Sequence, residues 1–234
     1  MPKTPEQIAC EAIDRRLEDA GWAIQDMKAL DLAASSGVAV REFPTGPVDY
    51  ALFVDGRPAG VVEAKKDADG QGITSVKGQS SRYAHSTFKY LDGDYEIRFA
   101  YEATGQITRF TNFHDEKYRS RSVFSFHQPE TLREWLVAPD TVRHNLKRFP
   151  ALDAAGFREC QKIALRNLQI SFADNRPRAL VQMVTGSGKT FTAITEAYPL
   201  LVYGKMNRIL FLVDTKSLGQ QAETEFMRYV PNGE

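Results

Sequence analysis

A glycine-rich turn between an apolar run and a helix-compatible stretch constrains this chain most strongly. Residues 179–184 are mainly apolar, residues 185–190 read Thr-Gly-Ser-Gly-Lys-Thr, and residues 191–197 suit a helix. Glycines let backbone N–H groups wrap around phosphate oxygens, and the N-terminus of a helix favours negative charge. The order of strand, turn and helix therefore predicts a phosphate-binding loop beside a parallel sheet.

The side chains of this loop have the chemistry that a nucleotide requires. Lys189 is expected to reach the β- and γ-phosphates, and Thr190 to ligate Mg²⁺. The backbone cradle is expected to come from Thr185, Gly186, Ser187 and Gly188. A second buried-strand run at 208–214 follows at the spacing of a βαβ unit. This part of the chain is therefore predicted to begin a RecA-like parallel-sheet domain that binds ATP.

A β-hairpin is predicted much earlier in the chain. Two apolar runs, 48–54 and 59–65, flank the turn sequence Asp-Gly-Arg-Pro. Asp49 opens the first run, and Glu63 and Lys65 close the second; residues two apart on a strand face the same side. Two carboxylates and an amine then converge at one end of the hairpin. Because carboxylate oxygens suit Mg²⁺, Asp49 and Glu63 are candidate metal ligands, and Lys65 is placed to orient or activate a water.

This arrangement resembles the active site of the PD-(D/E)xK nuclease superfamily, in which an Asp is followed by Glu-x-Lys on the next strand. A helix predicted over 73–88 adds Gln79 and Tyr83, which share one face because they lie four residues apart. This Gln-x-x-x-Tyr resembles a motif of RecB-like nucleases and type I restriction nucleases, and the resemblance implies a supporting role at DNA. The alternative is a hairpin whose strand ends carry ordinary surface charges.

The glycine-rich loop resembles that of superfamily 2 helicases, because Met183 occupies the position of the usual first glycine. Upstream, the sequence Phe-Arg-Glu-Cys-Gln at 157–161 is similar to the Gln motif of that superfamily, which implies that Gln161 reads the adenine edge. No Asp-Glu-x-x sequence follows the loop before Glu234. We therefore expect the chain by itself to bind ATP without turning it over.

In this order, the three motifs resemble the R subunit (HsdR) of type I restriction enzymes. The resemblance implies an α/β protein, with a restriction-endonuclease-like domain over 1–145, built on a mixed sheet flanked by helices, and an incomplete RecA-like domain over 146–234. It implies a type I site-specific deoxyribonuclease, in which Mg²⁺-dependent cleavage of double-stranded DNA is coupled to ATP-dependent translocation. The implied partners are methyltransferase (M) and specificity (S) subunits. Two alternatives remain: a DNA-repair helicase-nuclease outside restriction, and an ATP-dependent docking subunit with a vestigial nuclease site.

Charge, apolar runs and cysteine spacing indicate where the protein works, but they do not predict its activity. The 234 residues carry a formal net charge of zero, so any nucleic-acid site is expected to be a local patch. No apolar run is long enough to cross a membrane, and the two cysteines lack metal-binding spacing. These features favour a cytoplasmic protein with reduced thiols. On the first predicted helix, Glu11 and Glu18 are interpreted as part of a solvated face rather than as metal ligands.

Overall fold

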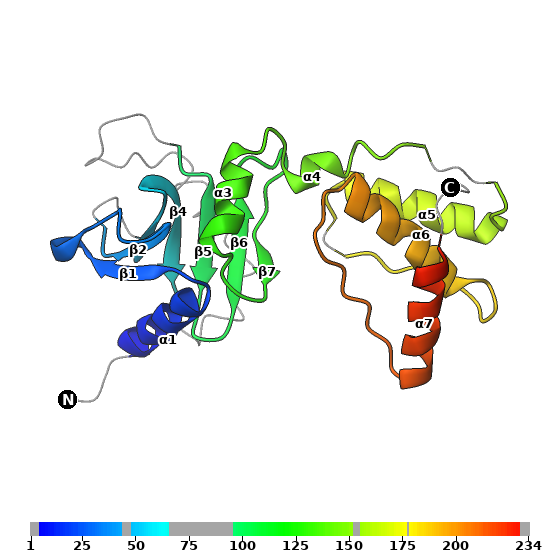
Figure 1. Cartoon of the computed structure of the whole chain (residues 1–234), viewed down its shortest axis with the longest axis horizontal. Coiled ribbons are helices and arrows are strands. Elements are labelled where there is room, and N and C mark those ends of the chain that lie inside the picture. Colours follow the sequence, from blue (N-terminus) through cyan, green and yellow to red (C-terminus); the bar gives the residue numbers. More distant parts are fainter. Residues whose placement is uncertain (1–4, 44–47, 66–95, 152–154, 177, 230–234) are drawn as a thin grey trace. The chain divides into compact units, whose positions relative to one another are not determined.

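The chain divides into two compact units, Met1–Pro139 and Asp140–Glu234, each of which is described by itself (Figure 1). The computed structural model describes residues 5–43, 48–65, 96–151, 155–176 and 178–229. The helix predicted over 73–88, with Gln79 and Tyr83, lies outside the described residues.

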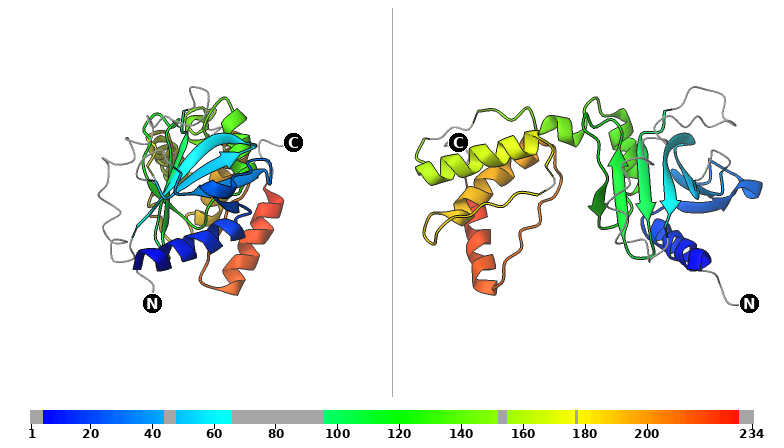
Figure 2. Two further views of the ribbon diagram at one scale, coloured as in Figure 1. Left: turned by 90° about the vertical axis from the view of Figure 1, so that its left-hand side faces the viewer. Right: turned by 180° about the vertical axis from the view of Figure 1, so that it is seen from behind.

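Unit 1 is built on a seven-stranded mixed sheet whose strands lie side by side in chain order (Figure 2). Two neighbouring pairs, β1–β2 and β4–β5, are parallel, and the other four pairs are antiparallel. The predicted mixed sheet is therefore confirmed. Its strands are β1 (Ala23–Asp26), β2 (Gly37–Arg41), β3 (Tyr50–Val54), β4 (Arg57–Ala64), β5 (Phe99–Ala103), β6 (Thr108–Asn112) and β7 (Arg121–Val123).

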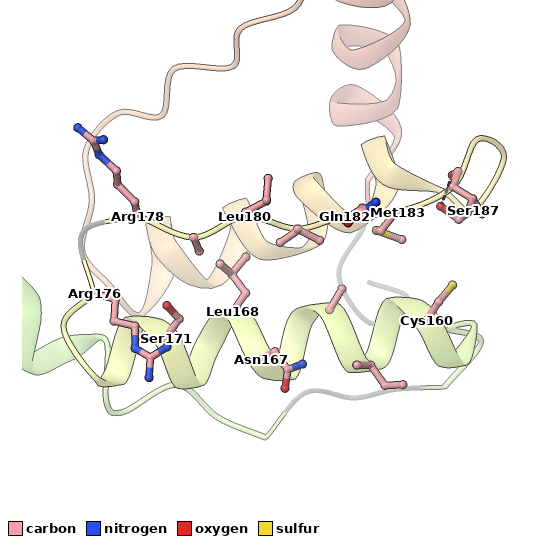
Figure 3. Close-up of a pocket in the computed structure, with 15 residues that line it drawn as sticks. Cys160, Asn167, Leu168, Ser171, Arg176, Arg178, Leu180, Gln182, Met183 and Ser187 are labelled. Atoms are coloured by element: carbon pink, nitrogen blue, oxygen red, sulfur yellow. Dashed lines mark hydrogen bonds between the residues drawn. The ribbon is translucent and has the colours of Figure 1, made fainter.

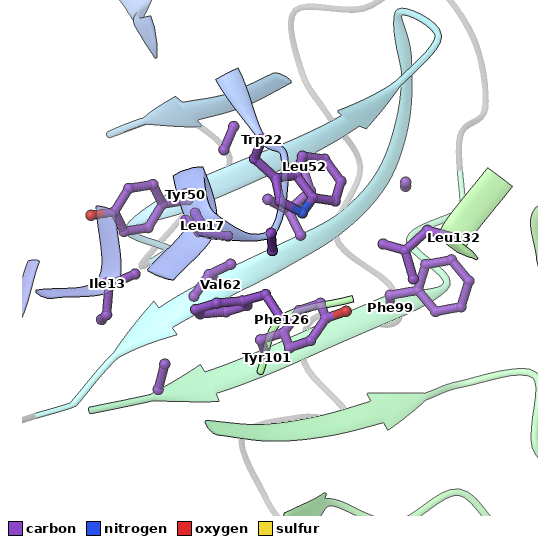
Figure 4. Packing of buried hydrophobic residues seen from close by; sticks show 14 of the residues in the cluster. Ile13, Leu17, Trp22, Tyr50, Leu52, Val62, Phe99, Tyr101, Phe126 and Leu132 are labelled. Atoms are coloured by element: carbon purple, nitrogen blue, oxygen red, sulfur yellow. The ribbon is translucent and has the colours of Figure 1, made fainter. Parts of the chain in front are cut away.

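Two helices of unit 1, α1 (Pro5–Asp19) and α3 (Pro129–Val137), pack against one face of this sheet. The cluster beneath them is fully buried and uses alternate strand residues (Figure 4), among them Ile13, Leu17, Leu52, Val62 and Leu132. The intervening strand residues, such as Ala51 and Val61, form a second cluster, because successive side chains of a strand point to opposite faces. Each buried Leu or Ile contributes about 1.5–3 kcal/mol, so the apolar stripe of each helix holds it on the sheet.

β3 and β4 form the predicted hairpin, and its turn has the geometry that the sequence requires. Asp55 and Gly56 both have positive φ, 49° and 73°, and Val54 pairs with Arg57 across them. A two-residue turn with two positive φ values is the type I′ hairpin turn, for which Asp-Gly is a favoured pair. Arg133 of α3 donates to both carboxylate oxygens of Asp55 at 2.6 Å. The turn is therefore tied to a helix, which holds this end of the hairpin in place.

The described part of unit 2 contains four helices: α4 (Val142–Asn145), α5 (Glu159–Ala173), α6 (Lys189–Val202) and α7 (Lys216–Arg228). α6 begins directly after the glycine-rich turn, as predicted. No helix that the structure describes in either unit is long and apolar enough to span a membrane.

The parallel sheet expected in unit 2 is not formed by the described residues. The segments 179–184 and 208–213 run without strand pairing, and Leu180 and Leu212 are 93% and 81% exposed. A parallel strand is stable within a sheet that pairs its edges and covers both its faces. Without such neighbours in the described structure, the two apolar segments stay single and open to water.

Candidate functional site

The open end of the β3–β4 hairpin brings Asp49 to the end of β4. The Asp49 N–H donates to the Val62 carbonyl at 3.1 Å, and the Ala64 N–H donates to Asp49 Oδ2 at 2.7 Å. Tyr50 pairs with Val62, so the next opposed pair is Asp49 and Glu63, and directly opposed residues share a face. The Asp49 carboxylate is therefore held beside the strand end that carries Glu63, as the sequence predicted.

Glu63 and Lys65 form an ion pair, so their side chains face the same way. Lys65 Nζ contacts Glu63 Oε1, and the two side chains are 20% and 12% exposed. The Lys65 N–H donates to the Ala103 carbonyl at 2.7 Å, which fixes this end of β4 against β5. Glu63 Oε2 is buried and accepts no hydrogen bond from any described residue. One carboxylate oxygen is thus held by the amine, and the other is available to a cation.

A third acidic residue, Glu102, was not among the predicted site residues. The parallel β4–β5 register pairs it with Glu63, and Glu102 is 6% exposed. Ser120 Oγ donates to Glu102 Oε2 at 3.2 Å, whereas Oε1 is buried without a hydrogen-bond partner in the described part of the chain. Burial raises the pKa of the Glu102 carboxyl, the Ser120 hydrogen bond opposes this, and the charge of Glu63 raises the pKa further.

Arg109 of β6 supports this group from the next strand. It pairs with Glu102 in the β5–β6 register, but its guanidinium donates to Ser120 instead, from Nε to Oγ at 2.9 Å and from Nη2 to the carbonyl at 2.8 Å. Arg109 therefore holds the hydroxyl that orients Glu102. Asp49, Glu63, Glu102 and Arg109 form a polar row across four neighbouring strands on one face of the sheet.

The chemistry of this row suits a hard divalent cation. Carboxylate oxygens are the ligands that Mg²⁺ prefers, and Mg²⁺ is usually held by one or two carboxylates while it keeps several waters. Within the described residues, no group of three His, Cys, Asp or Glu side chains is close enough to enclose an ion. The residues present therefore fit a cation bound through one or two carboxylates, with water completing its shell.

The other residues considered for the nuclease site are Gln79, Tyr83, Glu11 and Glu18. Gln79 and Tyr83 lie outside the described residues. α1 packs on the opposite face of the sheet from Glu63, and Glu18 is exposed, in agreement with its interpretation as part of a solvated face. The roles of Glu11, Gln79 and Tyr83 stay predictions.

The glycine-rich loop has the backbone that its sequence predicts. Gly186 and Gly188 have φ of 79° and 86°, a region that favours glycine, and Gly188 is the N-cap of α6. Ser187 Oγ donates to the Val184 carbonyl at 2.7 Å, and Lys189 Nζ donates to the same carbonyl at 3.3 Å. The start of α6 and the exposed Lys189 thus present positive charge, which favours an anion such as phosphate.

Gln161 of α5 lies against this loop. Its Oε1 accepts from the Arg158 N–H at 2.9 Å, and its Nε2 donates to the Ser187 carbonyl at 3.2 Å. A Cβ at Gly188 would lie 2.4 Å from Gln161 Nε2, so a side chain at this position would displace the Gln161 amide from the loop. Both ends of the amide are used within the protein, and Gln161 braces the loop; its reading of adenine stays a prediction.

The flanking threonines of the loop differ in exposure. Thr185 is exposed, whereas Thr190 in the first turn of α6 is half-buried. Their predicted roles, in the backbone cradle and as a ligand of Mg²⁺, stay predictions.

A cleft of about 650 Å³ lies between α5 and the unpaired segment 178–184 (Figure 3). Its walls are mostly apolar, with Leu168 on the helix and Leu180 on the segment. Arg176 and Arg178 lie at the end away from Ser187 (Figure 3). Since its basic side chains are remote from the loop, the cleft offers apolar surface near the loop rather than phosphate donors.

Two family models match separate parts of the chain. Residues 31–136, which carry β2 to β7, match the model described as "Type I restriction enzyme EcoKI endonuclease subunit second domain". Residues 155–234, which carry the glycine-rich loop, match the model described as "Type III restriction enzyme, res subunit".

Curated relatives extend this similarity over nearly the whole chain. The type I restriction enzyme EcoKI endonuclease subunit of Escherichia coli (strain K12) is 28% identical, over 95% of this chain and 23% of that protein. The SauCOLORF180P endonuclease subunit of Staphylococcus aureus (strain COL) is 23% identical, over 82% of this chain and 22% of that protein. The chain therefore spans less than a quarter of the length of these relatives.

Among solved structures, a fragment assigned to an HsdR subunit of a type I restriction enzyme from Vibrio vulnificus YJ016 is 20% identical. The similarity covers 89% of this chain and 40% of that chain, with a TM-score of 0.39.

Both parts of the chain thus match subunits of restriction enzymes. Within that class, the chain is similar to endonuclease subunits of type I restriction enzymes.

Proposed function

We propose that this chain is part of the restriction and translocation subunit of a type I restriction-modification enzyme. It cuts double-stranded DNA with Mg²⁺ at the end of the β3–β4 hairpin, and it binds ATP at the glycine-rich loop for translocation. The observation that carries the proposal is the convergence of Asp49, Glu63 and Lys65 at one strand end, where a buried oxygen of Glu63 has no partner among the described residues.

Each residue of the hairpin end has a distinct part in this proposal. Asp49 and Glu63 hold the cation, and a bound Mg²⁺ supplies a Lewis acid at the scissile phosphate. Lys65 has three N–H donors, so beside Glu63 it can orient an attacking water and offset the negative charge that develops on the phosphate. The Ala64 N–H orients Asp49, and the Ala103 carbonyl fixes the backbone of Lys65.

Nicking of supercoiled plasmid by the 234-residue chain tests the nuclease proposal. We expect cleavage with Mg²⁺ or Mn²⁺, loss of cleavage with EDTA, and a loss of about 10²–10³-fold on Asp49→Asn, because the amide cannot supply a charged ligand. Arg57→Ala, an exposed change on the same hairpin, should leave cleavage unaltered. Cleavage that survives Asp49→Asn would contradict this assignment, and no cleavage with either metal, even after assembly with M and S subunits, would favour a vestigial site.

Partner binding separates restriction from DNA repair. The names of the relatives specify type I restriction enzymes, and by the proposed function this chain works with methyltransferase and specificity subunits in the cytoplasm. Co-purification of a methyltransferase subunit with the full-length protein is the expected result. A full-length protein that cuts DNA but binds no methyltransferase subunit would instead indicate a repair helicase-nuclease.

Lys189→Ala is expected to weaken ATP binding by the chain about 10- to 100-fold, because a charge-assisted hydrogen bond contributes about 1.5–3 kcal/mol. Isothermal titration with ATP and Mg²⁺ measures the change. Lys216→Ala, which removes an exposed lysine from α7, is the matched control and should bind ATP as the unchanged chain does. Equal affinities of the Lys189 variant and the unchanged chain would remove the glycine-rich loop from the proposed ATP site.

A further inference from the structure

Glu63, whose side chain is 12% exposed, and Glu102, which is 6% exposed, lie in similar surroundings on adjacent strands. They are partners in the parallel β4–β5 register, so their side chains lie on the same face. In each, one oxygen is held by a neighbour: Lys65 contacts Glu63 Oε1, and Ser120 donates to Glu102 Oε2. In each, the other oxygen is buried and accepts no hydrogen bond within the described structure.

A buried carboxylate oxygen without a donor is costly, and two of them side by side also repel one another. Arg109, on the neighbouring strand, does not donate a hydrogen bond to Glu102, because its guanidinium donates to Ser120. Ser120, held twice by Arg109, instead fixes the Glu102 carboxylate. Glu102 itself is 94% buried, as its 6% exposure shows. The sheet therefore keeps two partly satisfied carboxylates together at the end of the site, which is an arrangement that a cation would stabilise.

We propose that Glu102 is a third carboxylate of the nuclease site and that Glu63 Oε2 and Glu102 Oε1 share a divalent cation. This inference rests on the proposed function, and it assigns to the site a residue that belongs to neither of the predicted motifs. Proteins usually bind Mg²⁺ through one or two carboxylates while the ion keeps several waters. Among the described residues, no group of three His, Cys, Asp or Glu side chains could hold an ion. Ser120 and Arg109 act as positioning residues for Glu102.

Binding of Mn²⁺ alone to the 234-residue chain, followed by electron paramagnetic resonance of the free ion, tests the inference without any cleavage. Glu102→Gln keeps the size and the Ser120 contact but removes the charge, and we expect it to weaken Mn²⁺ binding at least about tenfold. Glu18→Gln, an exposed change on α1, should bind as the unchanged chain does. Ser120→Ala should weaken binding less than Glu102→Gln, because it leaves Glu102 Oε1 in place.

The thermal midpoint of the same proteins separates metal binding from folding. Without metal, Glu102→Gln should melt no lower than the unchanged chain, because it relieves repulsion with Glu63. With Mn²⁺, the midpoint of the unchanged chain should rise, and that of Glu102→Gln should rise less. If Glu102→Gln fails to fold, Glu102→Asp replaces it, because the shorter side chain should also bind Mn²⁺ more weakly. Unchanged Mn²⁺ affinity in whichever variant folds would overturn the inference.

Plasmid nicking in parallel distinguishes failure of this inference from failure of the proposed function. Wild-type Mn²⁺ affinity in Glu102→Gln, with cleavage still abolished by Asp49→Asn, overturns the role of Glu102 and leaves the nuclease intact. Weakened Mn²⁺ binding in Glu102→Gln, with no cleavage by any form of the chain, supports the shared cation and removes the nuclease function.

Discussion

Lys65→Ala is expected to lower plasmid cleavage by about 10²–10³-fold, because it removes the amine that contacts the Glu63 carboxylate at the hairpin end. The same change should also lower the free energy of unfolding by about 1–3 kcal/mol, since it leaves the largely buried Glu63 carboxylate with one partner fewer. Chemical denaturation measures the second effect, and both are compared with Lys28→Ala, which removes an exposed lysine of unit 1.

A second substitution separates these two effects of Lys65. Adding Glu63→Gln to Lys65→Ala removes the uncompensated charge, so the double variant should regain much of the lost stability. It should not regain cleavage, because it then lacks both the amine and a metal-binding carboxylate. Recovery of cleavage along with stability would show that Lys65 is a structural residue that only neutralises Glu63, and the catalytic assignment of Lys65 would be withdrawn.

Glu196→Gln is expected to stabilise unit 2 by up to about 3 kcal/mol at pH 8. Glu196 lies in α6 and is 3% exposed. Its Oε2 accepts a hydrogen bond from Gln169 at 3.3 Å, and its Oε1 has no partner in the described part of the chain. Burial raises the pKa of Glu196 from 4.5 to about 7, and the Gln169 hydrogen bond only partly opposes this. At about 1.4 kcal/mol per pH unit, ionising this group in the folded state costs about 3 kcal/mol.

The sign of the pH dependence follows from the raised pKa of Glu196. The folded chain keeps the proton up to about pH 7, whereas the unfolded chain releases it near 4.5. The stabilisation is therefore fully present below pH 4.5 and is lost as the pH rises to about 7. Hydrogen exchange of the α6 amides at pH 5 and pH 8 should show this loss in the unchanged chain and in Glu223→Gln, an exposed control on α7. If the α6 amides of the unchanged chain and of Glu196→Gln were equally protected from exchange at pH 8, the predicted destabilisation by ionised Glu196 would be wrong.

The local features of the candidate site were predictable because each depends on a few neighbouring residues. Asp55-Gly56 predicts a tight turn, since both positions take positive φ. The turn and the two-residue period of a strand then bring Asp49, Glu63 and Lys65 to one end. Glycine at 186 and 188 likewise favours the positive φ seen in the glycine-rich loop.

Pairings between distant segments were not predictable in the same way. The unpaired segments 179–184 and 208–213 illustrate this in unit 2: their composition is that of buried strands, yet a strand exists only where another strand pairs with it. The contacts of Gln161 with the loop were also not predictable from the sequence, because they depend on how α5 packs against α6.

The sequence by itself determined the hairpin turn and the positive φ of the loop glycines, because local steric effects decide both. It also determined that Glu63 and Lys65 face the same side, because side chains alternate along a strand. Tertiary structure alone decided the place of Glu102. Its partner Glu63 lies 39 positions earlier, and the β4–β5 pair is parallel, so no hairpin turn sets its register. A slip of one residue would have turned Glu102 to the other face of the sheet, away from Glu63.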